Sequence, residues 1–193
     1  MQSKSFSRVI VSTDDEEIAA VARHSGAEVP FLRPAALAQD QSPAFELAIH
    51  ALDWLREDGG EPDYVFLLQP TSPLRTADDI RAAIDFATSR KADAVIGVTE
   101  ASPHPYLART MSAEGVLGYL IEVHPKPTSR HDYPAAWLIN GAVYLTSVES
   151  LRRTRTFQPP GALGFAMPPE RSLDIDTPWE LHLADLILRD ATH

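Results

Sequence analysis

The sequence contains no cysteine. This absence excludes disulfide bonds, thiolate metal sites and cysteine nucleophiles together. A chain of 193 residues does not need such cross-links, because a domain of this size buries roughly 70% of the surface that its unfolded chain exposes. A protein without cysteine also suits a reducing compartment, so we expect this protein to work in the cytoplasm.

No apolar run is long enough to span a bilayer, which would need about 20 residues. The first residues also lack the basic and then apolar layout of a secretory signal. These two absences predict that the protein has no membrane partner.

Positive charge is scarce, since 17 lysines and arginines stand against 27 aspartates and glutamates and give a net charge of −10. A protein that holds nucleic acid through its phosphates needs a basic face, so we expect no nucleic-acid partner. A small anionic ligand remains compatible with this charge if a few arginines gather or a metal ion is bound. The simpler interpretation is that the acidity keeps the protein in solution.

Four common catalytic signatures are missing, namely G-x-x-x-x-G-K-[ST], G-x-G-x-x-G, H-E-x-x-H and G-x-S-x-G. Their absence disfavours P-loop hydrolases, Rossmann dehydrogenases and zinc proteases. The seven histidines show no metal-ligand spacing. His104, which lies between Pro103 and Pro105, is therefore expected to be structural.

Strand and helix patterns alternate along most of the chain. Short runs rich in apolar residues predict strands at residues 8–11, 64–69, 93–98, 137–146 and 171–176. Helical spacing of apolar residues predicts two helices between the first and second of these runs, one between the second and third, and a last helix from Pro178. This alternation predicts a three-layer α/β/α domain over residues 1–193, with a mainly parallel sheet and helices on both faces.

Capping signals indicate where helices should begin and end. Thr13, with Glu16 three residues later, has the pattern of a capping box. Ser42 and Pro43 predict a second helix with a capping serine and with proline at its first position. Gly26 is expected to close the first of these helices.

The alternation breaks between Pro103 and Pro134, where prolines cluster. Residues 106–123 have the pattern of two strands around Glu114-Gly115. We therefore expect an arm or small lobe, inserted at about residues 103–135, that leaves the main sheet and forms a dimer contact.

A polar loop follows the strand predicted at residues 64–69. In an open α/β sheet, ligands bind beyond the carboxyl ends of the strands, and Gln69 lies at such an end. Gln69 could thus bind a ligand amide or hydroxyl. The alternative is an ordinary turn in which Thr71 and Ser72 satisfy backbone groups, and the pattern alone does not decide between the two.

Two aspartates alternate in the predicted strand at residues 171–176. Asp174 and Asp176 would project to the same side of that strand, roughly 7 Å apart, and would repel each other without a cation. Mg²⁺, held by one or two carboxylates and phosphate oxygens, would suit them. The alternative is that Asp176 merely precedes a helix cap formed by Thr177 and Glu180. That alternative leaves Asp174 without a role, so we favour the metal.

Arg33 and Ser42 lie between a strand end and a helix start, where phosphates or polar ligand edges are often bound. By itself this signal is weak, because capping alone would explain Ser42 and a single arginine is commonly just solvated.

Six stretches carry a resemblance to a known family. They are VIVSTDDEEIA, AEVPFLRP, LLQPTSPLRTADDI, VTEASPHPY, INGAVYL and ERSLDIDTPWEL, in this order from about residue 8 to residue 188. Together they resemble the acylneuraminate cytidylyltransferases, which are the CMP-sialic acid and CMP-nonulosonic acid synthetases. The resemblance implies an α/β/α fold of the nucleotide-diphospho-sugar transferase type and a homodimer formed through an arm-like lobe. It also implies that CTP and Mg²⁺ activate a nine-carbon keto sugar acid with release of pyrophosphate.

The resemblance further implies roles for individual residues. Asp174 and Asp176 match the family's metal-binding aspartates and would be the catalytic pair. Arg33 and Ser42 match positions that contact the nucleotide. The positions expected to line the sugar acid are Gln69, Arg130, Asn140, Tyr144 and Phe157. The implied reaction is attack of the sugar's anomeric hydroxyl on the α-phosphorus of CTP, which depends on positioning and on electrostatic stabilisation.

Two substitutions and one missing segment depart from the family pattern. Leu107 and Leu138 stand where relatives often have basic residues, which favours a related nonulosonic acid over sialic acid itself. The family's first strand and its basic phosphate-binding loop precede the segment that matches residues 8–15. Their absence leads us to expect a truncated or misassigned reading of a cytidylyltransferase with impaired activity.

Two other functions stay open at this point. One is a non-catalytic relative that binds the sugar or the nucleotide and does not need the phosphate loop. The other is a nucleotidyltransferase of similar fold that acts on a different sugar or cofactor.

Overall fold

The computed structural model describes residues 3–39, 41–122 and 129–190. The elements, in chain order, are α1 Glu16–His24, η1 Ala35–Leu37, α2 Ala44–Glu57, β1 Tyr64–Leu67, α3 Ala77–Arg90, β2 Ala94–Glu100, η2 Pro105–Leu107, β3 Arg109–Met111, β4 Leu117–Tyr119, η3 Arg130–Asp132, β5 Trp137–Ser147, α4 Val148–Thr154, β6 Leu163–Ala166, η4 Pro169–Arg171 and α5 Pro178–Asp190. Within the described ranges, no helix combines the length and apolar character needed to cross a membrane.

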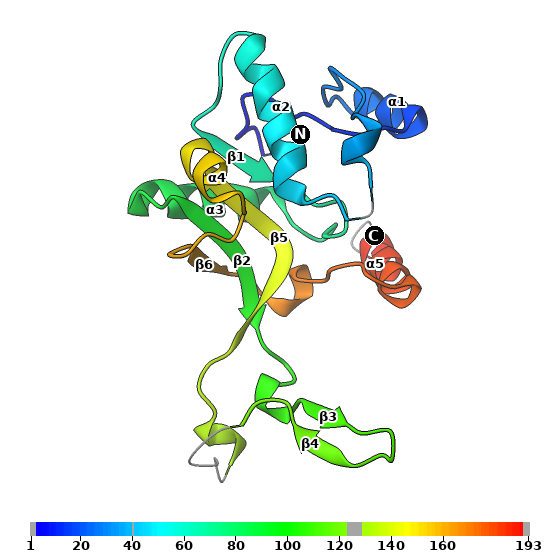
Figure 1. Ribbon diagram of the computed structural model, residues 1–193, viewed down its shortest axis with the longest axis vertical. Helices are drawn as coiled ribbons and strands as arrows, with labels where there is room; N and C mark the ends of the chain where they lie inside the picture. Colours follow the sequence, from blue (N-terminus) through cyan, green and yellow to red (C-terminus); the bar gives the residue numbers. More distant parts are fainter. Residues whose placement is uncertain (1–2, 40, 123–128, 191–193) are drawn as a thin grey trace.

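Four strands form the central sheet, in the order β1-β5-β2-β6 (Figure 1). Both β1 and β2 pair with β5 in the antiparallel sense, whereas β2 and β6 are parallel. Three strands therefore run in one direction, and β5 runs against them between β1 and β2. The predicted mainly parallel sheet is confirmed, with β5 as its single reversed strand among the residues described.

Helices cover both faces of this sheet. On one face, Ala83 and Ala87 of α3 pack with Val95 and Val143. On the other face, α2 and α4 form a second apolar cluster, to which Tyr144 belongs. Val143 and Tyr144 are successive residues of β5 and face opposite layers, as side-chain alternation in a strand requires. The predicted three-layer arrangement is thus confirmed.

A bulge interrupts the pairing of β5 with β2. Ile96 pairs with Tyr144, but Val98 pairs with Ile139, so four residues of β5 lie opposite Gly97 alone. Gly141 lies in this bulge with a φ of +71°, a left-handed conformation that favours glycine. Bulges of this kind re-aim side chains and are frequent beside active sites.

Two of the predicted strands are absent. Residues 8–11 make only an isolated parallel bridge, in which Ile10 faces Glu28. An apolar run becomes a strand only where a neighbouring strand pairs with it, and only Glu28 does so within the described residues. Residues 172–176 are also irregular, and their one backbone bond to the neighbouring loop is from Ile175 N to Thr71 O, at 2.9 Å.

Two of the predicted helix starts are also wrong. Asp15, and not Thr13, caps α1, because its carboxylate accepts hydrogen bonds from the backbone N–H groups of Glu17 and Ile18. Helix α2 begins at Ala44 after Pro43, and Ser42 Oγ instead accepts a hydrogen bond from Gln39 N, at 3.1 Å. A hydroxyl can satisfy either of two nearby N–H groups, and local spacing does not decide which one.

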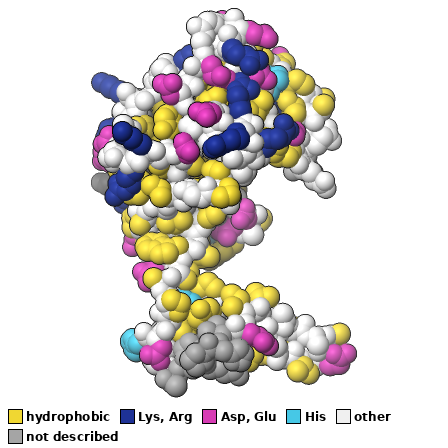
Figure 2. All heavy atoms as spheres, turned by 60° about the vertical axis from the view of Figure 1, so that its left-hand side comes forward, with side chains coloured by type: hydrophobic (Ala, Val, Ile, Leu, Met, Phe, Trp, Pro, Cys, Tyr) yellow, Lys and Arg dark blue, Asp and Glu magenta, His cyan; other side chains and the backbone are white. Residues whose placement is uncertain are grey.

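The segment between β2 and β5 leaves the sheet as an arm on a narrow neck (Figure 1). The hairpin of β3 and β4 forms its outer part, as the two predicted strands require. At the neck, His104 Nδ1 accepts from Tyr106 N and its Nε2 lies 2.9 Å from Pro134 O, so this histidine is structural. Hydrophobic side chains gather on the neck and on the side of the arm that faces the body, and the surface is hollowed between them (Figure 2).

Candidate active site

A cavity of about 310 Å³ opens beside the carboxyl end of β1. Its walls come from the start of α2, the end of β1, the middle of β5 and the loop after α4. Three of the residues predicted to line a sugar acid, Gln69, Tyr144 and Phe157, lie together in this cavity. The structure therefore brings side chains from three separate parts of the sequence to the sheet edge where ligands bind in open α/β folds.

Tyr144 provides a phenolic hydroxyl in the wall of this cavity. Its ring lies 6.2 Å from the ring of Phe157, in a T-shaped arrangement. Burial raises the pKa of Tyr144, the negative charge of Asp174 raises it further, and a hydrogen bond with Gln158 partly opposes both effects. Tyr144 is thus a neutral phenol at neutral pH and can donate a hydrogen bond.

Asp174 lies against the bulge of β5. A Cβ atom on Gly141 would be 2.6 Å from Asp174 Oδ2 and 2.9 Å from Ser72 Oγ, so both side chains use space that only a glycine leaves open. Asp174 Oδ1 and Ser72 Oγ are buried and have no hydrogen-bond partner among the described residues. Because a buried polar atom without a partner is destabilising, these two atoms are candidates for ligand or metal contacts.

Asp176 is in a different environment. It is exposed, and its backbone N–H donates to Glu180 Oε2 at 2.9 Å. Thr177 and Glu180 form the predicted capping box at the start of α5, with Thr177 N donating to Glu180 Oε2 at 2.7 Å. The two aspartates do not share a strand face, because residues 172–176 form no strand.

The loop after β1 is tied to β5 by Arg75, a residue that the sequence analysis did not single out. Arg75 donates to the carbonyl oxygen of Ala142 at 2.6 Å and to that of Gln69 at 3.3 Å. Burial lowers the pKa of Arg75, although the nearby charge of Asp79 partly offsets this. Its place at the end of the QPTSPLR stretch was the available signal, and its role is to hold the backbone of Gln69 in place.

Asn140 is buried, with 3% of its surface exposed, and both ends of its amide have protein partners. Its Nδ2 donates to Ser172 Oγ at 2.9 Å, and its Oδ1 accepts from Ala142 N at 3.1 Å. A Cβ atom on Gly97 would lie only 2.5 Å from Asn140 Oδ1. Asn140 is therefore packed into the bulge and does not line the cavity, so its predicted contact with the sugar acid remains a prediction.

The two residues expected to contact the nucleotide lie outside the cavity lining. Arg33 Nη2 pairs with Asp14 Oδ1 at 2.8 Å, while its Nε is buried without a partner in the described part of the chain. Ser42 immediately precedes Pro43, which lines the cavity. Ser42 is thus near the rim of the cavity. Arg33 links its own segment to the segment that contains Asp14.

Arg130 is the one predicted residue that lies on the arm. Its backbone is in η3, and its side chain is outside the described part of the structure. Figure 1 shows that, within one chain, the neck lies between the arm and the central sheet, whose strands β1 and β5 contribute to the cavity. The structure does not bring Arg130 together with Gln69, Tyr144 and Phe157.

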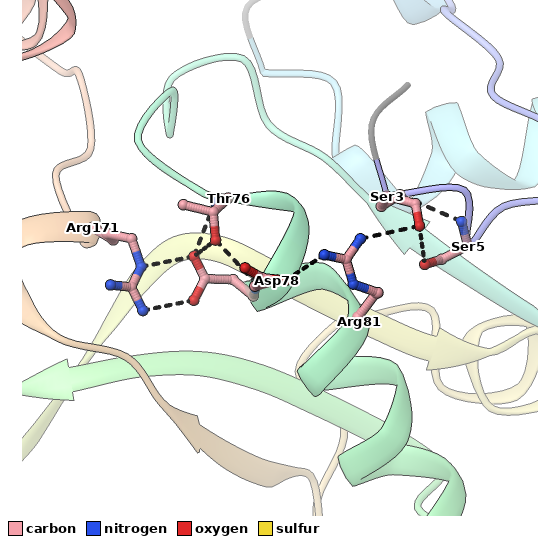
Figure 3. A network of polar contacts seen from close by, with 7 residues as sticks. Ser3, Ser5, Thr76, Asp78, Arg81 and Arg171 are labelled. Atoms are coloured by element: carbon pink, nitrogen blue, oxygen red, sulfur yellow. Dashed lines mark hydrogen bonds and ion pairs between the residues drawn. The ribbon is translucent and has the colours of Figure 1, made fainter. Parts of the chain in front are cut away.

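An ion pair between Arg171 and Asp79 was also missed by the sequence analysis. Arg171 donates through Nε and Nη2 to the two carboxylate oxygens of Asp79, both at 2.9 Å (Figure 3). Burial alone would raise the pKa of Asp79, but the hydrogen bonds from Arg171 and Thr76 outweigh it and hold this pKa below its ordinary value. The residues lie 92 positions apart, so the only available signal was that Arg171 directly precedes the SLDID stretch.

The acidic side chains suit a metal site that phosphate oxygens and water complete better than a site formed by protein ligands alone. In residues 3–39, 41–122 and 129–190, no three His, Cys, Asp or Glu side chains lie close enough together to hold a metal ion. Mg²⁺ commonly takes only one or two carboxylates and completes its coordination with water and phosphate oxygens. Asp174, with its unpartnered carboxylate oxygen, fits this mode of binding.

Comparison with known proteins points to one family. The sequence model of the family described as "Cytidylyltransferase" matches residues 1–128. The N-acylneuraminate cytidylyltransferase of Escherichia coli is 30% identical over 197 residues, which cover 95% of this chain. The CMP-N,N'-diacetyllegionaminic acid synthase of Legionella pneumophila is also 30% identical and covers 97% of this chain and 81% of its own length.

The matched relatives differ in length. This chain spans 42% of the Escherichia coli protein and 40% of its Streptococcus agalactiae counterparts. Among solved structures, a CMP:2-keto-3-deoxy-manno-octonic acid synthetase complexed with CTP aligns with a TM-score of 0.67 at 11% identity. That alignment covers 97% of this chain and 83% of the other, and it confirms the fold.

Proposed function

Because this chain belongs to the cytidylyltransferase family, we propose that it transfers CMP from CTP to a nonulosonic acid and releases pyrophosphate. One observation carries the proposal: the cavity that contains Gln69, Tyr144 and Phe157 lies where the charge of Asp174 reaches Tyr144. N-acylneuraminate and legionaminic acid are both nonulosonic acids, and this class is therefore our choice of acceptor. The lack of cysteine and the proposed use of CTP both support a cytoplasmic location for the reaction.

The residues of the cavity would bind and orient the acceptor. Gln69, whose backbone is held by Arg75, would hydrogen-bond a sugar hydroxyl or amide. Tyr144 would donate a hydrogen bond from its phenolic hydroxyl to a sugar oxygen. The anomeric oxygen would bond to the α-phosphorus of CTP as the bond to the β-phosphate oxygen breaks. Pyrophosphate would leave with that electron pair, and the hydroxyl proton would pass to solvent. Positioning of this kind contributes much of the rate in phosphoryl-type transfer.

Asp174 and Asp176 would hold Mg²⁺ together with phosphate oxygens of CTP. When bound, the metal would neutralise charge that develops on the phosphates. Asp174 is the stronger candidate of the two, because its Oδ1 is buried without a partner in the described residues whereas Asp176 is exposed. Arg33 and Ser42 would contact the nucleotide from the segments that flank the cavity.

The first prediction tests the reaction itself. We expect the purified chain to release pyrophosphate from CTP, in the presence of Mg²⁺, with one member of a panel of nonulosonic acids. ATP, GTP and UTP serve as matched controls and should give little release. Binding of CTP or of a sugar acid without release would replace this proposal with that of a non-catalytic binding relative.

The second prediction concerns assembly through the arm. Four apolar side chains of the arm are each at least 61% exposed, namely Met111, Val116, Leu117 and Leu120. Exposed apolar side chains that lie together often mark a surface that contacts another protein. We propose that they form a homodimer contact. Leu117→Asp should convert a dimer to a monomer in sedimentation analysis, whereas Val21→Asp, on the exposed face of α1, should not. A monomeric wild-type protein would contradict the proposal.

A further inference from the structure

The acidic segment, residues 172–176, has no regular structure, yet it is held at several points. At its start, Ser172 Oγ donates to Pro168 O at 2.8 Å and accepts from Asn140 Nδ2 at 2.9 Å. In its middle, Ile175 N donates to Thr71 O at 2.9 Å. Arg171, which immediately precedes the segment, makes the ion pair with Asp79. A segment without ladder hydrogen bonds depends on such contacts for its position.

We propose that the ion pair between Arg171 and Asp79 is a positioning pair that holds the carboxylate of Asp174 at the bulge of β5, ready for metal and nucleotide. The proposal deepens the proposed function and rests on it. Neither residue lines the cavity, so both would act through the placement of Asp174 and not by contact with substrate.

Asp79 is a rigid anchor. It has 5% of its surface exposed and lies at the third position of α3, where it forms a capping box with Thr76. Its carboxylate accepts four hydrogen bonds, two from Thr76 and two from Arg171. Helix α3 is itself fixed to the sheet through the buried Ala83 and Ala87. A guanidinium bound through two nitrogens to such a carboxylate has little freedom to move.

Asp174 needs an anchor because its own contacts do not hold it. Its Oδ1 is buried without a hydrogen-bond partner in the described residues, so hydration would draw this carboxylate outward if the segment were free. Arg171 lies three residues before Asp174, and the bond from Ile175 lies one residue after it. If both flanks are fixed in this way, the side chain of Asp174 stays beside Gly141 and Ser72. The cost of the unpartnered oxygen is thereby met by interactions elsewhere in the fold.

A neighbouring ion pair provides a matched control. Asp78 and Arg81 belong to the same turn of α3 and also pair as carboxylate and guanidinium (Figure 3). Their side chains are 87% and 46% exposed, and Arg81 otherwise contacts Ser3 O and not the acidic segment. Loss of this pair removes a similar interaction from the same helix without releasing Asp174.

The third prediction measures metal binding directly. Mn²⁺ replaces Mg²⁺, and its binding in the presence of CTP is followed by electron paramagnetic resonance. We expect Arg171→Gln to raise the dissociation constant for Mn²⁺ about 10–100-fold, the range typical for residues that orient metal ligands. Arg171→Lys should recover part of this loss, and Arg81→Gln should leave the constant near the wild-type value. The magnesium concentration for half-maximal pyrophosphate release should shift in parallel.

A second variant covers the case in which Arg171→Gln does not fold. Asp79→Asn keeps an oxygen for the Thr76 cap and removes the charge that Arg171 requires, and it should weaken Mn²⁺ binding similarly. The proposal is overturned if a folded Arg171 or Asp79 variant binds Mn²⁺ as the wild type does, or if Arg81→Gln weakens binding equally. A wild-type protein that neither binds Mn²⁺ with CTP nor releases pyrophosphate would instead overturn the proposed function.

Discussion

Changing Asp174 to asparagine is expected to lower pyrophosphate release by about 10²–10³-fold, the scale seen when one stabilising group is removed from a charged transition state. The substitution keeps the size of the side chain but removes the negative charge that would hold the metal. Of the two candidate aspartates, Asp174 should show the larger effect, because its Oδ1 is buried and unpartnered in the described residues while Asp176 is exposed. The initial rate with saturating CTP and sugar acid is the measurement.

The same variant should unfold no more easily than the wild type. A buried carboxylate oxygen without a partner destabilises the folded state, so removing its charge is expected to raise the free energy of unfolding, by up to about 2 kcal/mol. An inactive but equally or more stable protein is the signature of a residue kept for function. Urea denaturation of both proteins provides the comparison.

Asp93→Asn is the matched control for Asp174→Asn. The Asp93 side chain is 72% exposed, and it immediately precedes β2 at the end of the sheet away from the cavity. Its pair with Arg153, at 3.9 Å, is of the weak surface kind, so activity and stability should change little. If Asp174→Asn retained wild-type activity, the metal assignment would be wrong.

Changing Gly141 to alanine should have the second large effect, because it should lower both stability and activity. The new Cβ would lie 2.6 Å from Asp174 Oδ2 and 2.9 Å from Ser72 Oγ, and the φ of +71° is strained for any residue with a Cβ. Strain and overpacking together should lower the free energy of unfolding by about 2–4 kcal/mol. Because Asp174 must move to relieve the contact, pyrophosphate release should fall as well.

Gly161→Ala separates the two causes. Gly161 has a similar φ of +84°, but a Cβ there would meet no atom within 4 Å. This variant should carry only the backbone strain, about 1–2 kcal/mol, and keep its activity. Equal losses of stability and activity in both alanine variants would falsify the idea that Gly141 makes room for Asp174.

Much of the fold could be predicted because its signals are local. Apolar spacing within α2 and α3, the capping box at Thr177 and the two strands of the arm depend on residues a few positions apart. Periodicity and capping act over such distances, so a sequence pattern can report them. Gln69, Tyr144 and Phe157 were predicted as a group only through the family resemblance, because no short-range pattern joins them.

The predictions that failed depend on partners elsewhere in the chain. Residues 8–11 and 171–176 have strand-like patterns, but a strand also needs a neighbour to pair with, and the described residues provide neither segment with one. Thr13 and Ser42 are suitable caps, but the structure does not use them so. Asp15 accepts from the first N–H groups of α1 in place of Thr13, and Ser42 Oγ accepts from Gln39 N and not from α2. Such competition is decided by geometry that residue type does not specify.

By itself, the sequence determined the alternation of helices and strands, the two strands of the arm and the family, since each of these is carried by neighbouring residues or by ordered motifs. Only the tertiary structure decided what surrounds Asp174. The bulge at Gly141, the stretch from Ser72 to Asp79 and the Arg171 that pairs with Asp79 come from three separate parts of the chain, and Ser72 Oγ has no partner among the described residues. In our proposal, the position of one carboxylate depends on all of them at once, so packing determines the candidate site while local pattern determines the elements that carry it.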